Sequence, residues 1–528
     1  MSATRNVDKR KAIIETHFTS LDWLILGGYF VIVAITGALL SRRQATTRDY
    51  FLGGGKIPAW AAAISLLSAA LSGATFIGGP QQSYKGDLSY LIANIGSIIA
   101  VLIVAYYFVP MFYKNNDMTV YGILERKFGP PARLAAGSAY LLGRVFASGA
   151  RLYIAALPAS LIVFGDTKLD HLFFCIAVLT LVTIFYTLVG GIKSVIWTDV
   201  IQTAIFTGAA CIAIVVLMQK IPLSLGEIVE VLKHPGGDTA SKLTLFKLGF
   251  DGFDPKHAYT ILTAIFGFSL LNLGAYGTDQ DLAQKMLTCK SAVSGSRSAI
   301  GGILVGIPVT ALFMVAGLLL YVFYRQPAAM GALAPTYQPE GSREVFLTFI
   351  LREMPPGMPG LMLAGLFAAA LGTGLNAMSS AFVHDFYQRF RPGRLDRHYI
   401  NVGMLAVIGW GVILGLFAMV SAVWQEAHPG TTLIDFALSV MVFAYSGLVA
   451  VYLTALFTKR GSSASVVAAL LVGFGSVVTM QSLFAKSIAF PWQMFIATGL
   501  AFAVAQVGKR SPSPHSRASG NPSGKTEN

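Results

Sequence analysis

The fold is decided by two stretches of sequence, PAWAAAISLLSAALSGATFIGGPQQSY at residues 58–84 and AYTILTAIFGFSLLNLGAYGTDQD at residues 258–281. The first apolar stretch is interrupted at residues 72–75 and 78–80, and the second at residues 274–278. In hydrocarbon, a backbone N–H or C=O freed by such a break costs several kcal/mol unless something binds it. Packing alone also explains single glycines in membrane helices. Because the two breaks open two halves of the chain, we interpret them as the binding site of a transporter.

The composition is that of a membrane protein. Hydrophobic residues make up 55% of the 528-residue chain and charged residues only 12%, against roughly 25% charged residues in a typical soluble domain. An apolar run of about 18 residues or more is long enough to cross the hydrocarbon core, which is roughly 30 Å thick. The sequence contains thirteen such runs, at 21–40, 58–83, 89–113, 133–164, 170–189, 196–219, 258–278, 298–323, 358–387, 398–423, 432–457, 463–484 and 490–507. We therefore expect a multi-pass protein of the cell (inner or plasma) membrane, embedded in the lipid bilayer.

The net charge of +14 is distributed as in a membrane protein, so we expect no nucleic-acid partner. Basic residues gather in loops on one side of the predicted membrane, at 42–48, 126–133, 389–397 and 459–460. Loops of this kind usually lie in the cytoplasm. The N-terminus is therefore predicted to lie outside and the C-terminus inside, although basic residues in the N-terminal tail favour the opposite orientation.

The sequence lacks the motifs of several other protein classes. It contains no Walker A motif, no HExxH and no GxSxG. Its three cysteines, Cys175, Cys211 and Cys289, have neither disulfide nor metal-ligand spacing. We therefore expect neither an ATP-driven pump nor an enzyme, and no organic cofactor.

Several stretches occur together in an order typical of one family of membrane proteins. They are RDYFLGG at 48–54, FIG at 76–78, TVY at 119–121, LERKFG at 124–129, GGIKSVIWTDVIQ at 190–202, TDQDLAQKML at 278–287, and LNAMSS at 375–380 followed by DFY at 385–387. Over roughly residues 45–460 the chain resembles the sodium:solute symporter family, the group of sodium/glucose and sodium/proline cotransporters. Each stretch alone is weak, whereas the ordered set is specific for the family and not for the solute.

The resemblance implies an all-α fold of about 13 transmembrane helices with a leucine-transporter-type 5+5 inverted repeat. This arrangement agrees with two broken helices that open two halves. The implied parts are an N-terminal tail (1–20), a peripheral first span (21–40), two five-helix repeats (58–219 and 258–457), peripheral C-terminal spans (463–507) and a tail (508–528). The last tail is rich in Ser, Pro and Gly, which predicts disorder.

The resemblance also implies a secondary active transporter that moves a small organic solute by alternating access, with sodium or a proton as the coupling cation. Two alternatives stay open. One is a proton-coupled or uncoupled transporter of the same fold, and the other is a membrane solute sensor that does not transport. A sugar, an amino acid, a vitamin and a carboxylate are all compatible with the sequence.

Candidate substrate-binding residues lie at the two breaks. They are Ser72, Gly73, Ala74 and Thr75 at the first break, and Asp279 and Gln280 at the second. A half-helix that ends at a break exposes N–H and C=O groups that a solute can bind. The alternative is that the Ser and Thr hydroxyls bond back to their own helix. We interpret Asp281 only as a residue that marks a helix end.

Two arginines, Arg144 and Arg151, fall within the fourth predicted span. They are seven residues apart and therefore lie near one face of a helix. An arginine inside a membrane normally faces a water-filled cavity or an acidic partner. One interpretation is that the positive charge of the arginines attracts and binds an anionic solute. The other, which we favour, is structural pairing with Asp199, Asp279 or Glu125.

The resemblance places a sodium site here as well, and the sequence departs from it. The ion-binding positions fall on Ser68, Leu71, Leu366, Ala369, Ala370 and Thr373, with Asp199 near the cation path. In the family, two adjacent hydroxyl residues bind the ion at the positions of Ala369 and Ala370. A methyl group cannot coordinate a hard cation, which needs oxygen ligands. The usual sodium site is therefore predicted to be incomplete, with coupling through a second site or through protons at Asp199 or Asp279.

Overall fold

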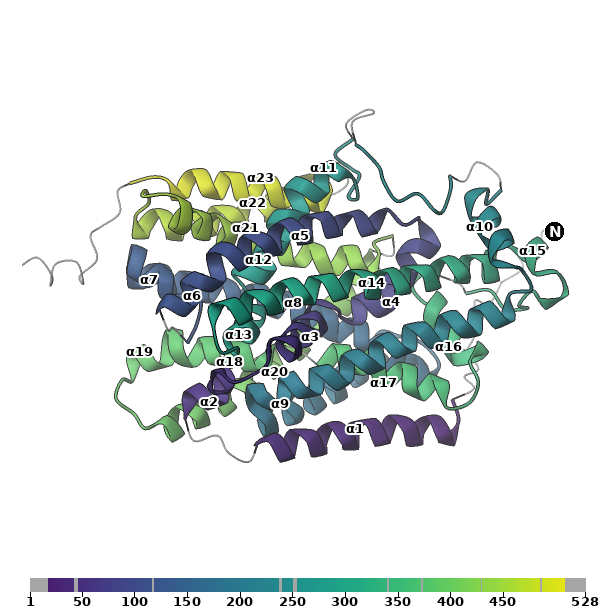
Figure 1. Ribbon diagram of the computed structural model, residues 1–528, viewed down its shortest axis with the longest axis horizontal. Coiled ribbons are helices and arrows are strands. Elements are labelled where there is room, and N and C mark those ends of the chain that lie inside the picture. Colours follow the sequence, from purple (N-terminus) through teal and green to yellow (C-terminus); the bar gives the residue numbers. More distant parts are fainter. Residues whose placement is uncertain are drawn as a thin grey trace, which may run out of the picture.

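The computed structural model describes residues 18–41, 46–115, 118–236, 240–249, 254–339, 341–371, 374–428, 430–484 and 487–508. Over these residues the regular structure is helical, apart from a single β-bridge between Ile57 and Cys289. Figure 1 shows most of the long helices running in nearly the same direction, as expected for helices that cross one membrane. The predicted all-α fold is confirmed.

Each predicted span has a helical counterpart in the described part of the chain. Seven helices are long and apolar enough to cross a membrane, two further pairs are bent spans, and four shorter apolar helices occupy the remaining positions. The elements of these spans are α1 (Ser20–Ser41), α3 (Ala59–Ala70), α4 (Gly73–Lys85), α5 (Ala93–Ile103), α8 (Pro130–Phe164), α9 (Leu169–Lys220), α12 (Ser269–Gly277), α13 (Gln280–Leu287), α14 (Ala292–Arg325), α17 (Met358–Leu371), α18 (Leu375–Ala381), η6 (Phe382–Tyr387), α20 (Asp396–Ala427), α21 (Leu433–Phe457), α22 (Ser463–Phe484) and α23 (Phe490–Ala505). Short helices lie in the connections, among them α2 (Thr47–Leu52), α7 (Gly122–Phe128), α10 (Leu225–Lys233), α16 (Val345–Glu353) and α19 (Gln388–Phe390).

A break is confirmed at both predicted places, but each is shorter than predicted. Residues 73–75 already belong to α4 and residues 274–277 to α12, so the breaks lie at residues 71–72 and 278–279. The chain bends by 61° between α3 and α4, and by 56° between the helix that ends at Gly277 and α13. Residues 78–80, in contrast, stay helical within α4. A Cβ atom at Gly78 would lie 2.8 Å from the Ile434 side chain, so this glycine allows α4 to pack closely against α21.

The two spans predicted at 170–189 and 196–219 are joined without a loop. They form α9, in which Gly191 has non-helical dihedral angles, φ 54° and ψ 179°. Glycine adopts a positive φ readily because it lacks a Cβ atom. The kink therefore lies at a residue that can form it with little strain.

The interior of the bundle brings the two broken helices together. In Figure 1, α1 lies at one edge of the molecule, and α22 and α23 lie at the opposite edge. Between them, α8 packs against α9, α20 and α21, while α3 packs against α14, α9 and α13. The second half of one broken helix, α13, thus contacts the first half of the other, α3, and this contact positions the candidate site.

Candidate functional site

At the first break, the hydroxyl groups cap the half-helix α4. The Ser72 hydroxyl accepts the Ala74 N–H at 3.2 Å, and the Ser72 N–H donates to the Thr75 hydroxyl at 3.5 Å. A Cβ atom at Gly73 would lie 3.3 Å from the Leu366 side chain, so α17 covers the break. The structure thus places all four predicted residues in one buried turn, with both hydroxyls engaged in the cap. Contact between this turn and a solute stays a prediction.

Arg151 lies on α8 directly beside this break. Its Nη1 atom donates to the Ala69 carbonyl at 2.8 Å, in the last turn of α3. Among the described residues no carboxylate forms an ion pair with Arg151, and 9% of the residue stays accessible. A guanidinium has five N–H donors in a fixed fork. Among the described residues, most donors of this buried fork therefore have no partner, next to the start of α4.

Arg144, on the same helix, is neutralised by two carboxylates from the second break. Its guanidinium lies 3.1 Å from Asp279 Oδ2 and also binds Asp281. The Tyr445 hydroxyl donates to the same Asp279 oxygen at 2.5 Å, and Asp279 Oδ1 accepts the Asp281 N–H at 2.9 Å. The structural pairing predicted between Arg144 and Asp279 is therefore present. Asp281 lies in the first turn of α13, as expected of a residue that marks a helix end, and it also shares the ion pair, which was not predicted.

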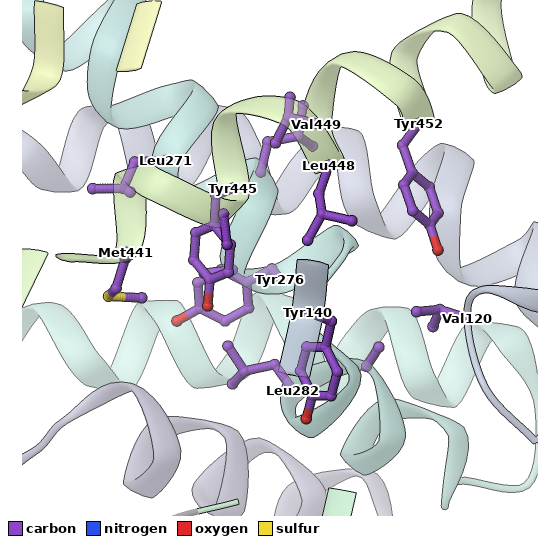
Figure 2. Close-up of a cluster of buried hydrophobic side chains, with 14 of the residues drawn as sticks. Val120, Tyr140, Leu271, Tyr276, Leu282, Met441, Tyr445, Leu448, Val449 and Tyr452 are labelled. Atoms are coloured by element: carbon purple, nitrogen blue, oxygen red, sulfur yellow. The ribbon is translucent and has the colours of Figure 1, made fainter. Parts of the chain in front are cut away.

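The surroundings of this ion pair are apolar. Figure 2 shows the buried cluster to which Tyr140, Tyr276, Leu282 and Tyr445 belong. A low local dielectric strengthens the attraction within an ion pair and also raises the cost of leaving one charge unpaired. Removal of one partner should therefore be far more damaging than removal of all of them.

Both polar atoms of the Gln280 side chain form hydrogen bonds with the protein backbone. Its Oε1 atom accepts the Val120 N–H at 2.9 Å, and its Nε2 atom donates to the Met118 carbonyl at 3.1 Å. The Tyr121 hydroxyl donates to the Thr278 carbonyl at 2.8 Å from the same loop. Gln280 thus ties α13 to the segment before α7, and its predicted contact with a solute is untested.

Asp199 forms a second buried ion pair, with a lysine that sequence reasoning missed. Lys285 Nζ lies 2.8 Å from Asp199 Oδ2 and donates to the Ser65 carbonyl at 3.0 Å. The Ser65 hydroxyl also donates to Oδ2, and the Ser68 hydroxyl donates to Oδ1 at 3.3 Å. This carboxylate therefore links α3, α9 and α13. The signal available in the sequence was a basic residue, Lys285, within a broken membrane segment that also holds two acids.

The predicted ion-binding positions are only partly described. Ser68 and Leu71 line a cavity of about 10 Å³, and Leu366 is buried on α17. Ala369 and Ala370 lie on α17, but their side chains are outside the described part of the structure. Thr373 falls outside the described residues altogether. The lack of hydroxyl groups at residues 369 and 370 follows from the residue types alone.

A further group of ion pairs lies at the predicted cytoplasmic helix ends. Arg133 lies 2.7 Å from Asp385 and 2.8 Å from Glu125, and Arg389 lies 2.9 Å from the other Glu125 oxygen. Burial by itself raises the pKa of Glu125, but the hydrogen bonds from the two arginines outweigh burial and hold this pKa below its ordinary value. Glu125 is therefore not a partner of Arg144. The ion pairs tie α7 and α8 to η6 and α19.

Comparison with known proteins identifies the family. A family model described as "Sodium:solute symporter family" matches residues 50–473. The chain belongs to the sodium:solute symporter family. This symporter is 27% identical to the sodium/sialic acid symporter SiaT of Proteus mirabilis, over 88% of the chain and 90% of the relative. It is also 27% identical to the human sodium-coupled monocarboxylate transporter 1, over 87% of the chain and 72% of the relative.

A solved structure shows the same fold. It is that of a Na⁺-coupled sialic acid symporter in a substrate-bound outward-open state, and it matches with a TM-score of 0.79 and 24% identity over 94% of this chain and 100% of the other. At 24% sequence identity, this match shows that the two proteins share a fold. Together with the family, it confirms the predicted secondary transporter, a multi-pass membrane protein and not an enzyme.

Proposed function

We propose that this symporter carries a small organic anion that bears a carboxylate, and that Arg151 binds it at the first break. The observation that carries this proposal is a buried guanidinium whose one described hydrogen bond is to a carbonyl, at Ala69. Arginine binds carboxylates through two parallel hydrogen bonds. Arg144 does not have this capacity, since Asp279 and Asp281 already neutralise it.

The direction of the two half-helices supports the same proposal. The start of α4 at Gly73 carries the partial positive charge of a helix N-terminus, which favours an anion. The end of α3 at Ala70 exposes carbonyl groups, which favour a cation. An anion bound beside Arg151 would therefore meet two sources of positive charge, while Ser72, Thr75 and Asp279 form the rest of the proposed site.

The relatives support the choice of solute class. One is named for sialic acid and another for monocarboxylates, and both kinds of molecule carry a carboxylate at neutral pH. The two differ greatly in size, so the feature they share is the charged group. We infer that Arg151 binds this shared carboxylate group.

The proposed solute class predicts which compounds stabilise the purified protein against heat. We expect N-acetylneuraminic acid, lactate or another carboxylate to raise the melting temperature, since a ligand at 100 times its Kd adds about 2.7 kcal/mol to the free energy of unfolding. The methyl esters of the same acids keep most of the shape and lose the charge, and we expect no shift with them. Equal shifts with acids and esters would rule out recognition of the carboxylate.

We also propose that sodium coupling through the usual site is weak, because Ala369 and Ala370 supply no oxygen. Proton coupling at Asp199 or Asp279 would first have to break an ion pair, with Lys285 or Arg144. The remaining oxygens near the break include the carbonyls at the end of α3 and the hydroxyl of Ser68. These support a site of low affinity.

Restoring the two hydroxyls should strengthen the response to sodium. We expect the double variant Ala369→Ser, Ala370→Thr to lower the sodium concentration for half-maximal uptake at least about tenfold, because about 1.4 kcal/mol of added cation binding corresponds to a tenfold change. The measurement is solute uptake into proteoliposomes, with sodium replaced by choline at fixed pH. The neighbouring change Ala368→Ser is the matched control. A steep, high-affinity sodium requirement in the unmodified protein would show that other oxygens already complete the site.

A further inference from the structure

The connection between α9 and α12, residues 221–260, contains a buried lysine. In Figure 1, α10 of this connection lies at the end of the bundle opposite α19. Lys242 is only 3% exposed, and its backbone N–H donates to the Leu232 carbonyl at 2.9 Å, in the last turn of α10. A lysine is almost never fully buried unless its ammonium group is paired. The partners of Lys242 therefore show what this connection holds in place.

The ammonium group of Lys242 lies on the carbonyl end of α4. Its Nζ atom donates to the Tyr84 carbonyl at 2.8 Å and to the Gly86 carbonyl at 2.7 Å. The same Nζ atom lies 4.2 Å from the centre of the Tyr321 ring, a cation–π contact. The last carbonyls of a helix have no partner within the helix and carry a partial negative charge. Lys242 thus satisfies and neutralises the outer end of the half-helix that begins at Gly73.

A second contact with the outer end of α4 follows five residues later. Lys247 Nζ lies 2.7 Å from Oδ2 of Asp87, which comes just after α4. The Lys247 carbonyl also accepts the Ile261 N–H at 3.0 Å. Ile261 begins the second bent span, whose first part ends at Gly277. Residues 242–247, here called the bridging segment, therefore join the outer end of the first broken helix to the start of the second.

We propose that Lys242 is a positioning residue for the proposed anion site, because it holds α4 in place against the start of the second broken helix. In this respect the inference rests on the proposed function, in which the N-terminus of α4 faces an anion bound at Arg151. The apparent affinity of a ligand falls in proportion to the fraction of molecules in the binding-competent arrangement. Lys242 lies about 20 Å along α4 from Gly73, so it sets the affinity without touching the solute.

Lys242→Met tests this role through the kinetics of carboxylate uptake into proteoliposomes. Methionine keeps an apolar stem beside Tyr321 and removes the ammonium group. We expect the KM for the carboxylate to rise roughly tenfold, as it does when only about a tenth of the molecules hold α4 in position. The maximal rate per inserted protein should change less than about twofold, because saturating solute itself draws α4 into position. A loss of folded protein alone would lower the maximal rate and leave the KM unchanged.

Amide hydrogen exchange tests the same role in the full-length protein without any solute, since exchange reports local opening of a helix directly. We expect amides over residues 76–86 to exchange at least about tenfold faster in Lys242→Met than in the unmodified protein. In Lys242→Ala, n-propylammonium replaces the missing atoms and charge and should slow this exchange again. Propanol, which has the same carbon chain and no charge, should not.

Lys233→Met is the matched control. Lys233 lies on α10 in the same connection, is exposed, and lies 3.8 Å from Glu230 on its own helix. This variant should keep the KM and the exchange of the unmodified protein. Should Lys242→Met fail to fold, Lys247→Met decides the question, because its side chain is 46% exposed and tolerates the change. We expect this variant to raise the KM about threefold and to speed the exchange of the same amides.

Unchanged KM and unchanged exchange in Lys242→Met would overturn the inference, as would equal effects in Lys233→Met. The proposed function fails separately, when the unmodified protein transports no carboxylate. In that case exchange in the solute-free protein still decides whether Lys242 holds α4. Carboxylate transport that depends on Arg151 and is indifferent to Lys242 would leave the proposed function intact and remove the positioning role.

Discussion

Replacement of Arg151 by glutamine is expected to reduce carboxylate uptake by roughly thirtyfold or more. The loss of one partner from a buried, hydrogen-bonded charge pair costs about 2–5 kcal/mol, and each 1.4 kcal/mol is a factor of ten. The protein should still fold, because no acid depends on Arg151 for neutralisation among the described residues. The measurement is the initial rate of carboxylate uptake into proteoliposomes over a range of solute concentrations, normalised to the amount of protein inserted.

Arg151→Lys separates charge from geometry. Lysine keeps the positive charge but lacks the planar fork that binds both carboxylate oxygens. We expect its activity to lie between that of the unmodified protein and that of Arg151→Gln. Uptake by Arg151→Gln at the unmodified rate would show that the anion is bound elsewhere, or that the solute is neutral.

Arg144→Met, seven residues earlier on the same helix, should unfold the protein. The change leaves Asp279 and Asp281 buried next to each other without a cation. Breaking a buried ion pair from one side costs about 3–5 kcal/mol, which is a large part of the stability of a typical domain. The expected result is little folded protein after extraction in detergent and a strongly lowered melting temperature.

The matched test removes all three charges together. The triple variant Arg144→Met, Asp279→Asn, Asp281→Asn leaves no unpaired charge, and replacement of a whole buried ion pair is often close to neutral for stability. We expect most of the lost melting temperature to return. If Arg144→Met alone is as stable as the unmodified protein, the ion pair does not hold the second break together.

The break positions could be predicted because their cause is local. Glycine and small polar residues interrupt an apolar run at 72–75 and near 278, and the chain bends at both places. The interruption at Gly78 looked similar in sequence but is a packing contact with Ile434. Whether such a glycine breaks its own helix or packs against another one depends here on a helix more than 350 residues away. It therefore cannot be predicted from the local sequence.

The charge pairs could be predicted only in part. Arg144 stood out as a buried cation, but the identity of its partners depends on how α8 meets α13. The ion pair between Asp281 and Arg144 was therefore not predicted, and Lys285, the partner of Asp199, was missed.

We propose that the protein moves a carboxylate across the membrane by alternating access. The most direct measurement is counterflow in proteoliposomes that are preloaded with an unlabelled carboxylate, found in the stability screen, and diluted into a trace of the labelled compound. We expect transient accumulation of label above the external concentration, which should be absent from protein-free liposomes and strongly reduced in Arg151→Gln. Stabilisation by the carboxylate without any accumulation of label would show that the protein binds the solute without transporting it, as a solute sensor of the same fold would.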